Sequence, residues 1–337
     1  MRHAHTIIHY NNRYNYVQKL RIILVMTGLL SCFCVRAQYD PNFSHYFDIE
    51  PQYNPAAVGK ESKLNVSAAY ALNMMGFEHN PRTLYIAADI PFYALKTYHG
   101  AGIQLQNDQI GAFVHQRLAV QYALKHPLFG GTLSVGVQAG FLSEKLDGSK
   151  IDLEDSSDPA FAGGDQNGNS IDLSAGLYYT RGPWYVGASV QHITAPLIEL
   201  GETNELKIDP TYYFTGGYNI KLRNPFLTIH PSLFFRTDGN AYRGDVTARV
   251  VYRHENKMMY AGLGGAFGNS YKEKLGATSV TAYIGGSFHG INLGYSYELY
   301  TSAISPANGS HELVITYQTD INLTKKGKNK HKSVRYL

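Results

Sequence analysis

The chain has 337 residues, of which 44% are hydrophobic and only 17% are charged, and its mean hydropathy is −0.25. This hydropathy excludes a bundle of transmembrane helices, whereas 27 tyrosines and 33 glycines fit either a transmembrane β-barrel or a secreted β-sandwich. Five of the 30 basic residues precede Gln38, so the rest of the chain carries 25 basic against 26 acidic residues, and nothing in this balance suggests a nucleic-acid-binding protein.

The first predicted element is a cleavable signal peptide over residues 1–37. A basic flank precedes a short apolar run that ends at Val35, and small residues stand three and one before a cut after Ala37. A lipoprotein signal with its cut before Cys32 is the rival interpretation. Both cysteines of the chain, Cys32 and Cys34, lie inside this element, so the mature chain is expected to contain no disulfide and no thiolate metal site.

The next element, residues 38–63, is an irregular segment rich in aromatic residues and proline. Proline cannot donate a hydrogen bond to a sheet, so this segment is not a strand. It is also too apolar for a free tail, so we expect it to pack into the mouth of the folded domain. Its aromatic side chains are candidate anchors for a protein partner, because binding energy concentrates in such residues. These candidates are Phe43, Tyr46, Phe47 and Tyr53.

A period of two in hydrophobicity then predicts strands along most of the chain. Ile291, Leu293 and Tyr295 alternate with Asn292 and Gly294, which gives one apolar and one polar face. About ten such residues suffice for a tilted strand to cross a bilayer. The predicted strands lie at roughly 64–73, 82–90, 100–107, 116–125, 131–146, 169–181, 184–193, 209–222, 227–237, 243–254, 257–267, 279–289, 290–300 and 310–319.

These runs predict an all-β fold, namely a single transmembrane antiparallel β-barrel of about 14 strands over residues 64–320. Short connections, as at Gly290, alternate with long ones, as at 147–169, which is typical of periplasmic turns and extracellular loops. An even strand count returns both ends to one side of the membrane. We therefore expect periplasmic termini, with residues 38–63 and the basic tail 321–337 both in the periplasm.

Charged residues within the strands are expected to face the lumen, because a cation on the lipid face costs about 2–4 kcal/mol at the bilayer midplane. In one run, Val246 and Val250 mark an apolar face, and the opposite face carries Asp245, Arg249 and Arg253. These three lumen charges predict either a salt-bridged polar filling of the barrel or a transport filter.

Enzyme motifs are missing from the sequence. It contains no H-E-x-x-H zinc pair and no phosphate-binding P-loop, so we predict no catalytic residue, no cofactor and no metal site. Acidic residues gather between 147 and 172, but their spacing fits no EF-hand, and a solvated surface loop is the favoured interpretation. Six basic residues after position 324 fit a solvated end, with contact to an acidic partner or to anionic headgroups as alternatives.

Six sequence blocks in a fixed order carry a resemblance to a known family. They are QYDPNFSHY at 38–46, QYNPA at 52–56, GIQLQNDQIG at 102–111, SDPAF at 157–161, LGYSYE at 293–298 and GSHEL at 309–313. Together they resemble the PorP/SprF family of outer-membrane proteins, which belong to the type IX secretion system of Bacteroidetes. The departures are Tyr39, which stands between Gln38 and Asp40, and the long lead before the signal.

This resemblance implies a membrane subunit without catalytic residues. Members are associated with cargo secretion through the outer membrane, with adhesin display in gliding motility, and with periplasmic ring and peptidoglycan-binding components. We therefore expect an outer-membrane, lipid-embedded subunit that docks or anchors exported cargo or adhesin and periplasmic components. The alternatives are a general diffusion or uptake channel for small solutes and a soluble secreted β-sandwich binder.

Overall fold

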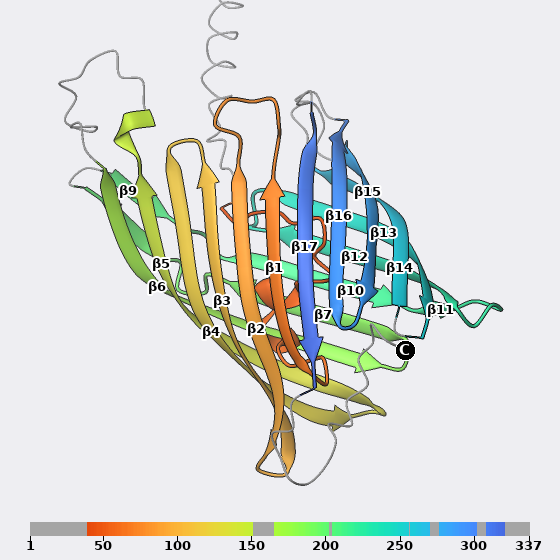
Figure 1. Cartoon of the computed structure of the whole chain (residues 1–337). Coiled ribbons are helices and arrows are strands. Elements are labelled where there is room, and N and C mark those ends of the chain that lie inside the picture. The colour runs from red at the N-terminus through yellow and green to blue at the C-terminus, as the bar shows by residue number, and fades with distance from the viewer. Residues whose placement is uncertain are drawn as a thin grey trace, which may run out of the picture. The chain divides into compact units, whose positions relative to one another are not determined.

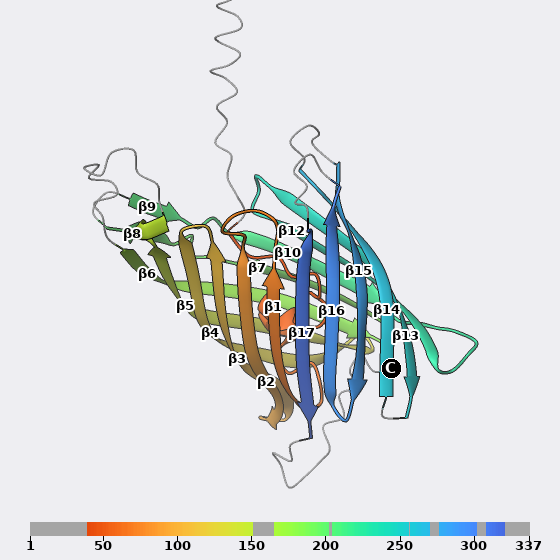
Figure 2. The ribbon, with the colours of Figure 1, turned by 45° about the horizontal axis from the view of Figure 1, so that its top comes forward.

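A closed β-barrel dominates the structure (Figures 1 and 2). In the computed structural model the strands pair with their neighbours in an antiparallel ladder, and β1 pairs with β17, so the sheet closes on itself. Closure leaves no unpaired edge, as a lipid environment requires. The all-β barrel of fourteen strands predicted from the sequence is therefore confirmed. The described residues are 39–150, 165–201, 204–255, 257–269, 276–301 and 308–320.

Each predicted run corresponds to one barrel strand. The barrel strands are β1 (Leu64–Leu72), β2 (Arg82–Ala94), β3 (Thr97–Ile110), β4 (Phe113–Leu128), β5 (Gly131–Leu146), β6 (Gln166–Arg181), β7 (Trp184–Gln191), β10 (Thr211–Tyr218), β12 (Leu227–Thr237), β13 (Tyr242–His254), β14 (Lys257–Gly268), β15 (Gly276–Phe288), β16 (Ile291–Tyr300) and β17 (Ser310–Thr319).

Smaller elements accompany the barrel. The strands β8 (Leu197–Leu200) and β9 (Asn204–Lys207) form a separate hairpin that the sequence pattern did not predict, and β11 (Ile220–Lys221) extends the sheet beside β12. None of the helices among the described residues is long and apolar enough to cross a membrane. The predicted signal peptide, the tail 321–337 and most of the acidic loop lie outside the described residues.

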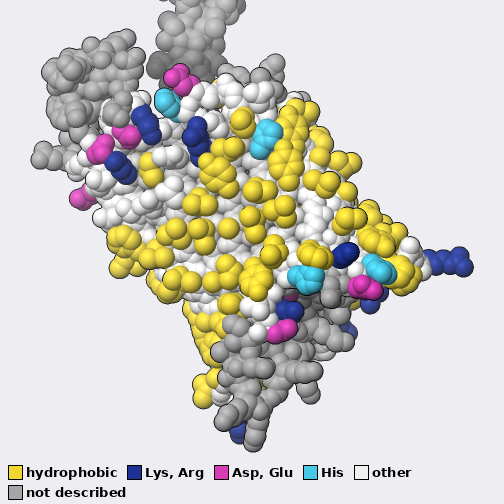
Figure 3. Space-filling view, in the orientation of Figure 1, with side chains coloured by type: hydrophobic (Ala, Val, Ile, Leu, Met, Phe, Trp, Pro, Cys, Tyr) yellow, Lys and Arg dark blue, Asp and Glu magenta, His cyan; other side chains and the backbone are white. Residues whose placement is uncertain are grey.

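The alternating sequence pattern explains the two faces of the wall. On β5, Val135 and Val137 are exposed on the outside, whereas Ser134 and Gln138 are buried on the inside. The same holds on β16, where Leu293 is exposed and Ser296 is buried. Hydrophobic side chains cover the middle of the visible wall, and charged ones gather toward its two ends (Figure 3). This band is the surface that lipid covers in a transmembrane barrel.

The connections differ between the two ends of the barrel. At the end that we call the short-turn end, β1 begins, β17 ends, and tight turns join hairpins at Leu95, Phe129 and Gly290. At the opposite end, the long-loop end, the connections include 147–165 and 192–210. In bacterial outer-membrane barrels the short turns are periplasmic and the long loops extracellular.

We predict that arginine on the outer face destabilises the barrel according to depth. Val137→Arg, in the middle of β5, should lower the free energy of unfolding by about 2–4 kcal/mol, whereas Leu133→Arg, near the end of the same strand, should cost about 0–1 kcal/mol. Urea titration of the barrel folded into lipid vesicles measures both values. Equal costs at the two positions would contradict the assignment of this band to lipid.

Candidate functional site

Residues 39–63, called the N-terminal segment from here on, run through the inside of the barrel (Figure 1). Near its start, Asp40 accepts a hydrogen bond of 2.7 Å from Tyr213, at the beginning of β10 and so at the long-loop end. Near its end, the backbone N–H of Gly59 donates to Asp89 of β2. The chain then enters β1 at Leu64, at the short-turn end. The segment therefore crosses the lumen from one end to the other.

This path differs from the one expected from the sequence. The segment and the chain after β17 were expected to leave the barrel at one end, but Tyr39 and Asp40 lie at the long-loop end while Thr319 lies at the short-turn end. An even strand count fixes only where the first strand begins and the last one ends. An irregular segment in front of β1 remains free to turn back through the lumen, and it does so here.

The segment folds locally into two short 3-10 turns, Glu50–Gln52 and Pro55–Ala57, each with a proline in its first positions. A proline there loses no hydrogen bond, because the first N–H groups of a helix have no partner within it. Asn54 precedes the second turn and bridges it to the wall. Its side chain accepts from the N–H of Ala56 and donates to the backbone carbonyl of Leu177, both at 2.9 Å.

The four aromatic residues predicted to dock a partner all lie inside the barrel, with at most 4% of each side chain exposed. Tyr46 stacks on the ring of Phe234 of β12, with 4.9 Å between centroids, and Tyr53 packs against the same ring at 4.6 Å. In this conformation they seat the segment and present no surface to another protein. The four are Phe43, Tyr46, Phe47 and Tyr53.

Polar side chains of the wall satisfy the backbone of the segment. Gln121 of β4 donates to the carbonyl of Pro51, and Ser189 of β7 donates to that of Tyr53, at 2.6 and 2.7 Å. Glu312 of β17 accepts from two consecutive backbone N–H groups of the segment, at Ser44 and His45. Unpaired backbone groups away from water are costly, so these partners hold the irregular chain in one path.

Glycines on the inner face leave room where the segment touches the wall. A Cβ on Gly136 of β5 would lie 2.2 Å from the backbone nitrogen of Ala56, and one on Gly100 of β3 would lie 2.1 Å from the carbonyl oxygen of Val58. A Cβ on Gly176 of β6 would lie 2.0 Å from the side-chain oxygen of Asn54. No side chain fits at these distances, so the wall is shaped to receive the segment.

Charged groups fix the start of the segment at the long-loop end. The carboxylate of Asp40 lies 3.1 Å from Nε2 of His192, just beyond β7, and Nδ1 of the same ring lies 3.2 Å from Asp172. The second contact lacks hydrogen-bond geometry, so it is electrostatic. Arg117 of β4 approaches Asp40 at 3.9 Å. A buried charge needs such partners.

These contacts shift the pKa values of both His192 and Asp40. Burial by itself would lower the pKa of His192, but the neighbouring carboxylates of Asp40 and Asp172 outweigh it and raise the pKa to about 9. Burial by itself would raise the pKa of Asp40, but the charges of His192 and Arg117 and the hydrogen bonds hold it well below its usual range. The pair is therefore an ion pair at neutral pH.

The β8–β9 hairpin belongs to the long connection between β7 and β10 and lies at the same end of the barrel. Ile198 and Leu200 of β8 are buried against Leu142 of β5, and Tyr39 packs against this cluster. A Cβ on Gly168 of β6 would lie 2.3 Å from the carbonyl oxygen of Glu199, so the wall makes room for the hairpin as well. The hairpin and the start of the segment therefore pack against the same part of the wall at the long-loop end.

The three predicted lumen charges all lie on the inner face of β13, but they do not form one group. Asp245 pairs with Arg243 rather than with the other two, and Arg243 also reaches Glu298 of β16 at 2.7 Å. The guanidinium of Arg249 lies 3.5 Å from the ring centroid of Phe47 in the segment. Arg253 lies closer to the short-turn end and contacts the sulfur of Met258.

Several small gaps lie between the described wall and the segment. Three gaps there leave about 40, 10 and 10 Å³, which is room for water molecules and not for a solute. Among the residues that the structure describes, no group of three or more His, Cys, Asp or Glu side chains could hold a metal ion. Around these gaps the segment is packed against the side chains of the wall.

Sequence reasoning missed the wall residues that receive the segment. Alternation could have assigned Arg117, Gln121 and Lys125 to the inner face of β4, because Leu118 and Tyr122 mark its outer face. Alternation shows only on which face of the sheet a residue lies. It could not have predicted contacts with the N-terminal segment, because that segment has no alternating pattern.

We predict that Gly136→Ala loosens the segment without opening the barrel. The new methyl group meets backbone atoms of the segment, and overpacking of this kind costs about 1–3 kcal/mol. Chymotrypsin cleavage between residues 43 and 53 should then be about tenfold faster or more in the detergent-solubilised protein, as read by mass spectrometry. Heat-modifiable gel mobility should stay unchanged because the strand ladder is intact.

Gly140→Ala is the matched control. It lies on the same face of the same strand, and its Cβ would make only an ordinary contact, 3.4 Å from Ala119. Its cleavage rate should equal that of the wild type. Equal cleavage rates for the Gly136 and Gly140 variants would refute the conclusion that Gly136 leaves room for the segment.

We also predict that alkali weakens the fixation of the segment through His192. Because its folded pKa is raised, its stabilisation is complete below the unfolded pKa of about 6.5 and is lost as the pH rises through about 9. The urea midpoint of the wild type should fall between pH 7 and pH 10. His192→Gln should start lower at pH 6 and converge with the wild type at pH 10; a constant difference between the two would contradict the assignment.

One protein family and several solved structures are similar to this chain. The sequence profile described as "Type IX secretion system membrane protein PorP/SprF" matches residues 35–317. No curated protein sequence matches the chain. The chain is similar to a mutant of the TodX monoaromatic hydrocarbon channel, with 9% identity, 80% of this chain and 93% of that chain covered, and a TM-score of 0.46.

Two further solved structures are similar. For a Pseudomonas aeruginosa FadL homologue the identity is 12%, the coverage 78% of this chain and 92% of that one, and the TM-score 0.44. For BamA from Haemophilus ducreyi lacking POTRA domains 1–3 the identity is 10%, the coverage 76% of this chain and 70% of that one, and the TM-score 0.42. At these TM-scores the likenesses carry no conclusion about ligands or function. The family profile covers most of the chain and its barrel, and the chain belongs to the PorP/SprF family of type IX secretion system membrane proteins.

Proposed function

We propose that the protein is a docking subunit of the type IX secretion machinery whose barrel is closed by its own N-terminal segment. The observation that carries this proposal is the course of that segment through the lumen, with its aromatic side chains buried and its backbone bonded to the wall. A barrel filled in this way offers other proteins its two ends rather than a passage.

The two ends suit different partners. If the short turns face the periplasm, as in other outer-membrane barrels, periplasmic secretion components meet the tips of the hairpins there. Leu95 and Phe129 at two of these tips are 91% and 82% exposed. Exported cargo or a gliding-motility adhesin would be held at the long-loop end. The cleavable signal peptide, residues 1–37, is the proposed route of export.

The aromatic residues first considered as docking anchors receive a different role in this proposal. Because the barrel wall buries them, they hold the segment in its resting position. A partner could contact them only after the segment had left the lumen. The diffusion-channel alternative fits less well, since the segment runs through the lumen with its backbone bonded to the wall.

We predict that the purified wild-type barrel gives no stable current steps in planar bilayers, because the segment fills the lumen. A variant lacking residues 43–57 removes most of the filling and should conduct. Heat-modifiable mobility shows whether this variant still forms a barrel. Large, stable currents from the wild type would refute the closed state.

Docking itself needs a second measurement. Extraction of outer membranes in mild detergent should recover the protein together with other type IX secretion components, and amine crosslinking from the exposed Lys96 at the β2–β3 turn should capture one of them. Recovery of the barrel alone under both conditions would contradict a docking role.

A further inference from the structure

The β2–β3 and β4–β5 hairpins extend past the start of β1 at the short-turn end (Figure 1). Asn65, near the start of β1, pairs with Asp89 of β2, and β2 then continues to Ala94. At about 3.3 Å per residue, the β2–β3 hairpin projects about 16 Å along the strand beyond that pair. The register of β3 with β4 brings the β4–β5 turn to the same level.

Aromatic side chains on the outer face indicate where the lipid ends, because such residues form girdles at the two membrane interfaces. Tyr122 of β4 and Phe288 of β15 are exposed on the outer face toward the short-turn end. The turn at His289 follows Phe288 directly, whereas Phe129 lies about 23 Å along the strand from Tyr122. With a strand tilt of about 45°, the tips of the two long hairpins stand about 16 Å beyond the girdle, in water.

The residues at these two tips break the usual preference of their turns. Both hairpins end in two-residue loops, Leu95–Lys96 and Phe129–Gly130, in which every φ is positive, between 47° and 74°. Such turns favour Asn, Asp and Gly, because other side chains crowd the backbone there. The turn between β15 and β16, at the same end, carries the more usual pair His289–Gly290.

The two apolar tips gain no compensating contact within the barrel. Leu95 is 91% exposed and Phe129 82%, and neither belongs to a hydrophobic cluster of the described residues. Strained backbone together with a nearly fully exposed apolar side chain, at two tips of equal height, indicates a contact surface. We call Leu95 and Phe129 the tip pair.

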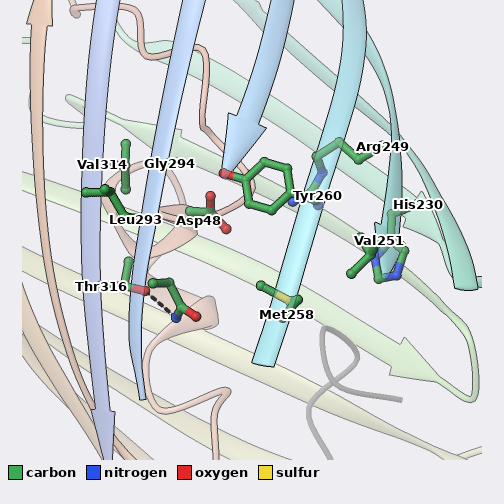
Figure 4. Close-up of a pocket in the computed structure, with 11 residues that line it drawn as sticks. Asp48, His230, Arg249, Val251, Met258, Tyr260, Leu293, Gly294, Val314 and Thr316 are labelled. Atoms are coloured by element: carbon green, nitrogen blue, oxygen red, sulfur yellow. Dashed lines mark hydrogen bonds between the residues drawn. The ribbon is translucent and has the colours of Figure 1, made fainter. Parts of the chain in front are cut away.

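The inner side chains at this end point the other way. Tyr260 and Met258 of β14 and Arg249 of β13 converge on a gap of about 40 Å³ inside the lumen, which has room for water (Figure 4). The tip pair projects away from the barrel instead. A partner therefore reaches it without entering the lumen and without displacing the N-terminal segment.

The spacing of the tip pair suits a helix. Two inter-strand spacings separate the β2–β3 hairpin from the β4–β5 hairpin, so the tips stand about 10 Å apart. Side chains at i and i+7 of an α-helix lie on one face and are separated by about 10.5 Å along its axis. One helix with an apolar stripe can therefore contact both tips at once.

The charges around the tips are of one sign. Residues 90–104 and 119–137, which form the two projecting hairpins, contain no Asp and no Glu. Lys96 is exposed at the first tip. Arg181, at the end of β6, is exposed beside the second tip, since a Cβ on Gly130 would lie 3.8 Å from its Nε. Carboxylates on the partner complement these two cations.

We propose that the tip pair holds an amphipathic helix of a protein partner, with an apolar stripe that packs on Leu95 and Phe129 and with acidic residues flanking that stripe. The inference deepens the proposed docking function and rests on it, since it names the surface and the chemistry of the partner at the short-turn end. Burial of the two apolar side chains supplies the affinity. Lys96 and Arg181 orient the helix and make its association sensitive to salt.

The test places the photoreactive residue p-benzoylphenylalanine at position 129 of the full chain in its own outer membrane, which keeps an aromatic ring at the tip. Illumination should capture a secretion component. Mass spectrometry of the crosslinked peptide should show apolar residues at i and i+7 with Asp or Glu beside them. Adding Leu95→Asn should reduce this capture about fivefold to tenfold. Because Asn adopts positive φ readily, the urea midpoint of that variant should equal or exceed the wild-type value.

His289→Asn is the matched control. It introduces the same residue into the same kind of two-residue turn at the same end, and it removes no apolar tip. Its capture should stay within about twofold of the wild type. Equal losses in the two variants, undiminished capture with Leu95→Asn, or a captured segment without the apolar repeat and carboxylates would overturn the proposal. Capture of phospholipid or of a second copy of this chain would also overturn it.

Failure of the tip pair can be told apart from failure of the docking function. A barrel that co-purifies with secretion components but gives no crosslink from position 129 refutes the tip pair alone. A barrel that is recovered without any secretion component, in mild detergent and after amine crosslinking alike, refutes the docking function itself.

Discussion

A closed ladder of fourteen strands encloses more space than its own side chains can fill, and the rest of the structure depends on this constraint. About eight strands already suffice for an interior filled by wall side chains alone. A wider barrel must hold water, a ligand or additional chain. Here the N-terminal segment supplies the additional chain, and the wall supplies what an irregular backbone lacks, namely donors such as Gln121 and Ser189 and acceptors such as Glu312. Glycines at Gly100 and Gly136 then set how closely the two surfaces approach.

The filling differs electrostatically along the barrel axis. Toward the long-loop end the charges are matched, with Asp40 between His192 and Arg117 and with Arg243 between two carboxylates. Toward the short-turn end the guanidinium of Arg249 stacks on the ring of Phe47, and Asp48 lines the same gap. Buried charges persist only where they are paired, so the matched end is suited to stay closed.

The sequence predicted the wall far better than the filling, for a physical reason. Lipid outside and polar surroundings inside impose a period of two, so every barrel strand and the inward direction of Asp245, Arg249 and Arg253 could be derived from alternation. The N-terminal segment has no period, and its contacts join residues more than a hundred positions apart, such as Asp40 with His192. The β8–β9 hairpin was missed for the same reason, because its two strands of four residues lie within a long connection. The aromatic residues were predicted to be anchors for a partner, and alternation could not show that the wall of the same chain buries them.

The position of the segment also bears on how the barrel closes. The segment leads directly into β1, and β1 closes the ladder against β17. Glu312, which accepts the N–H groups of Ser44 and His45, stands on β17 opposite Ala71 of β1. The same strand pair that completes the sheet therefore also holds the first half of the segment. Asn65 of β1 bonds to Asp89, whose other oxygen accepts from Gly59 at the end of the segment. Binding of the segment to the wall and closure of the sheet thus stabilise each other. Each supplies hydrogen-bond partners for buried polar groups that would otherwise be unpaired.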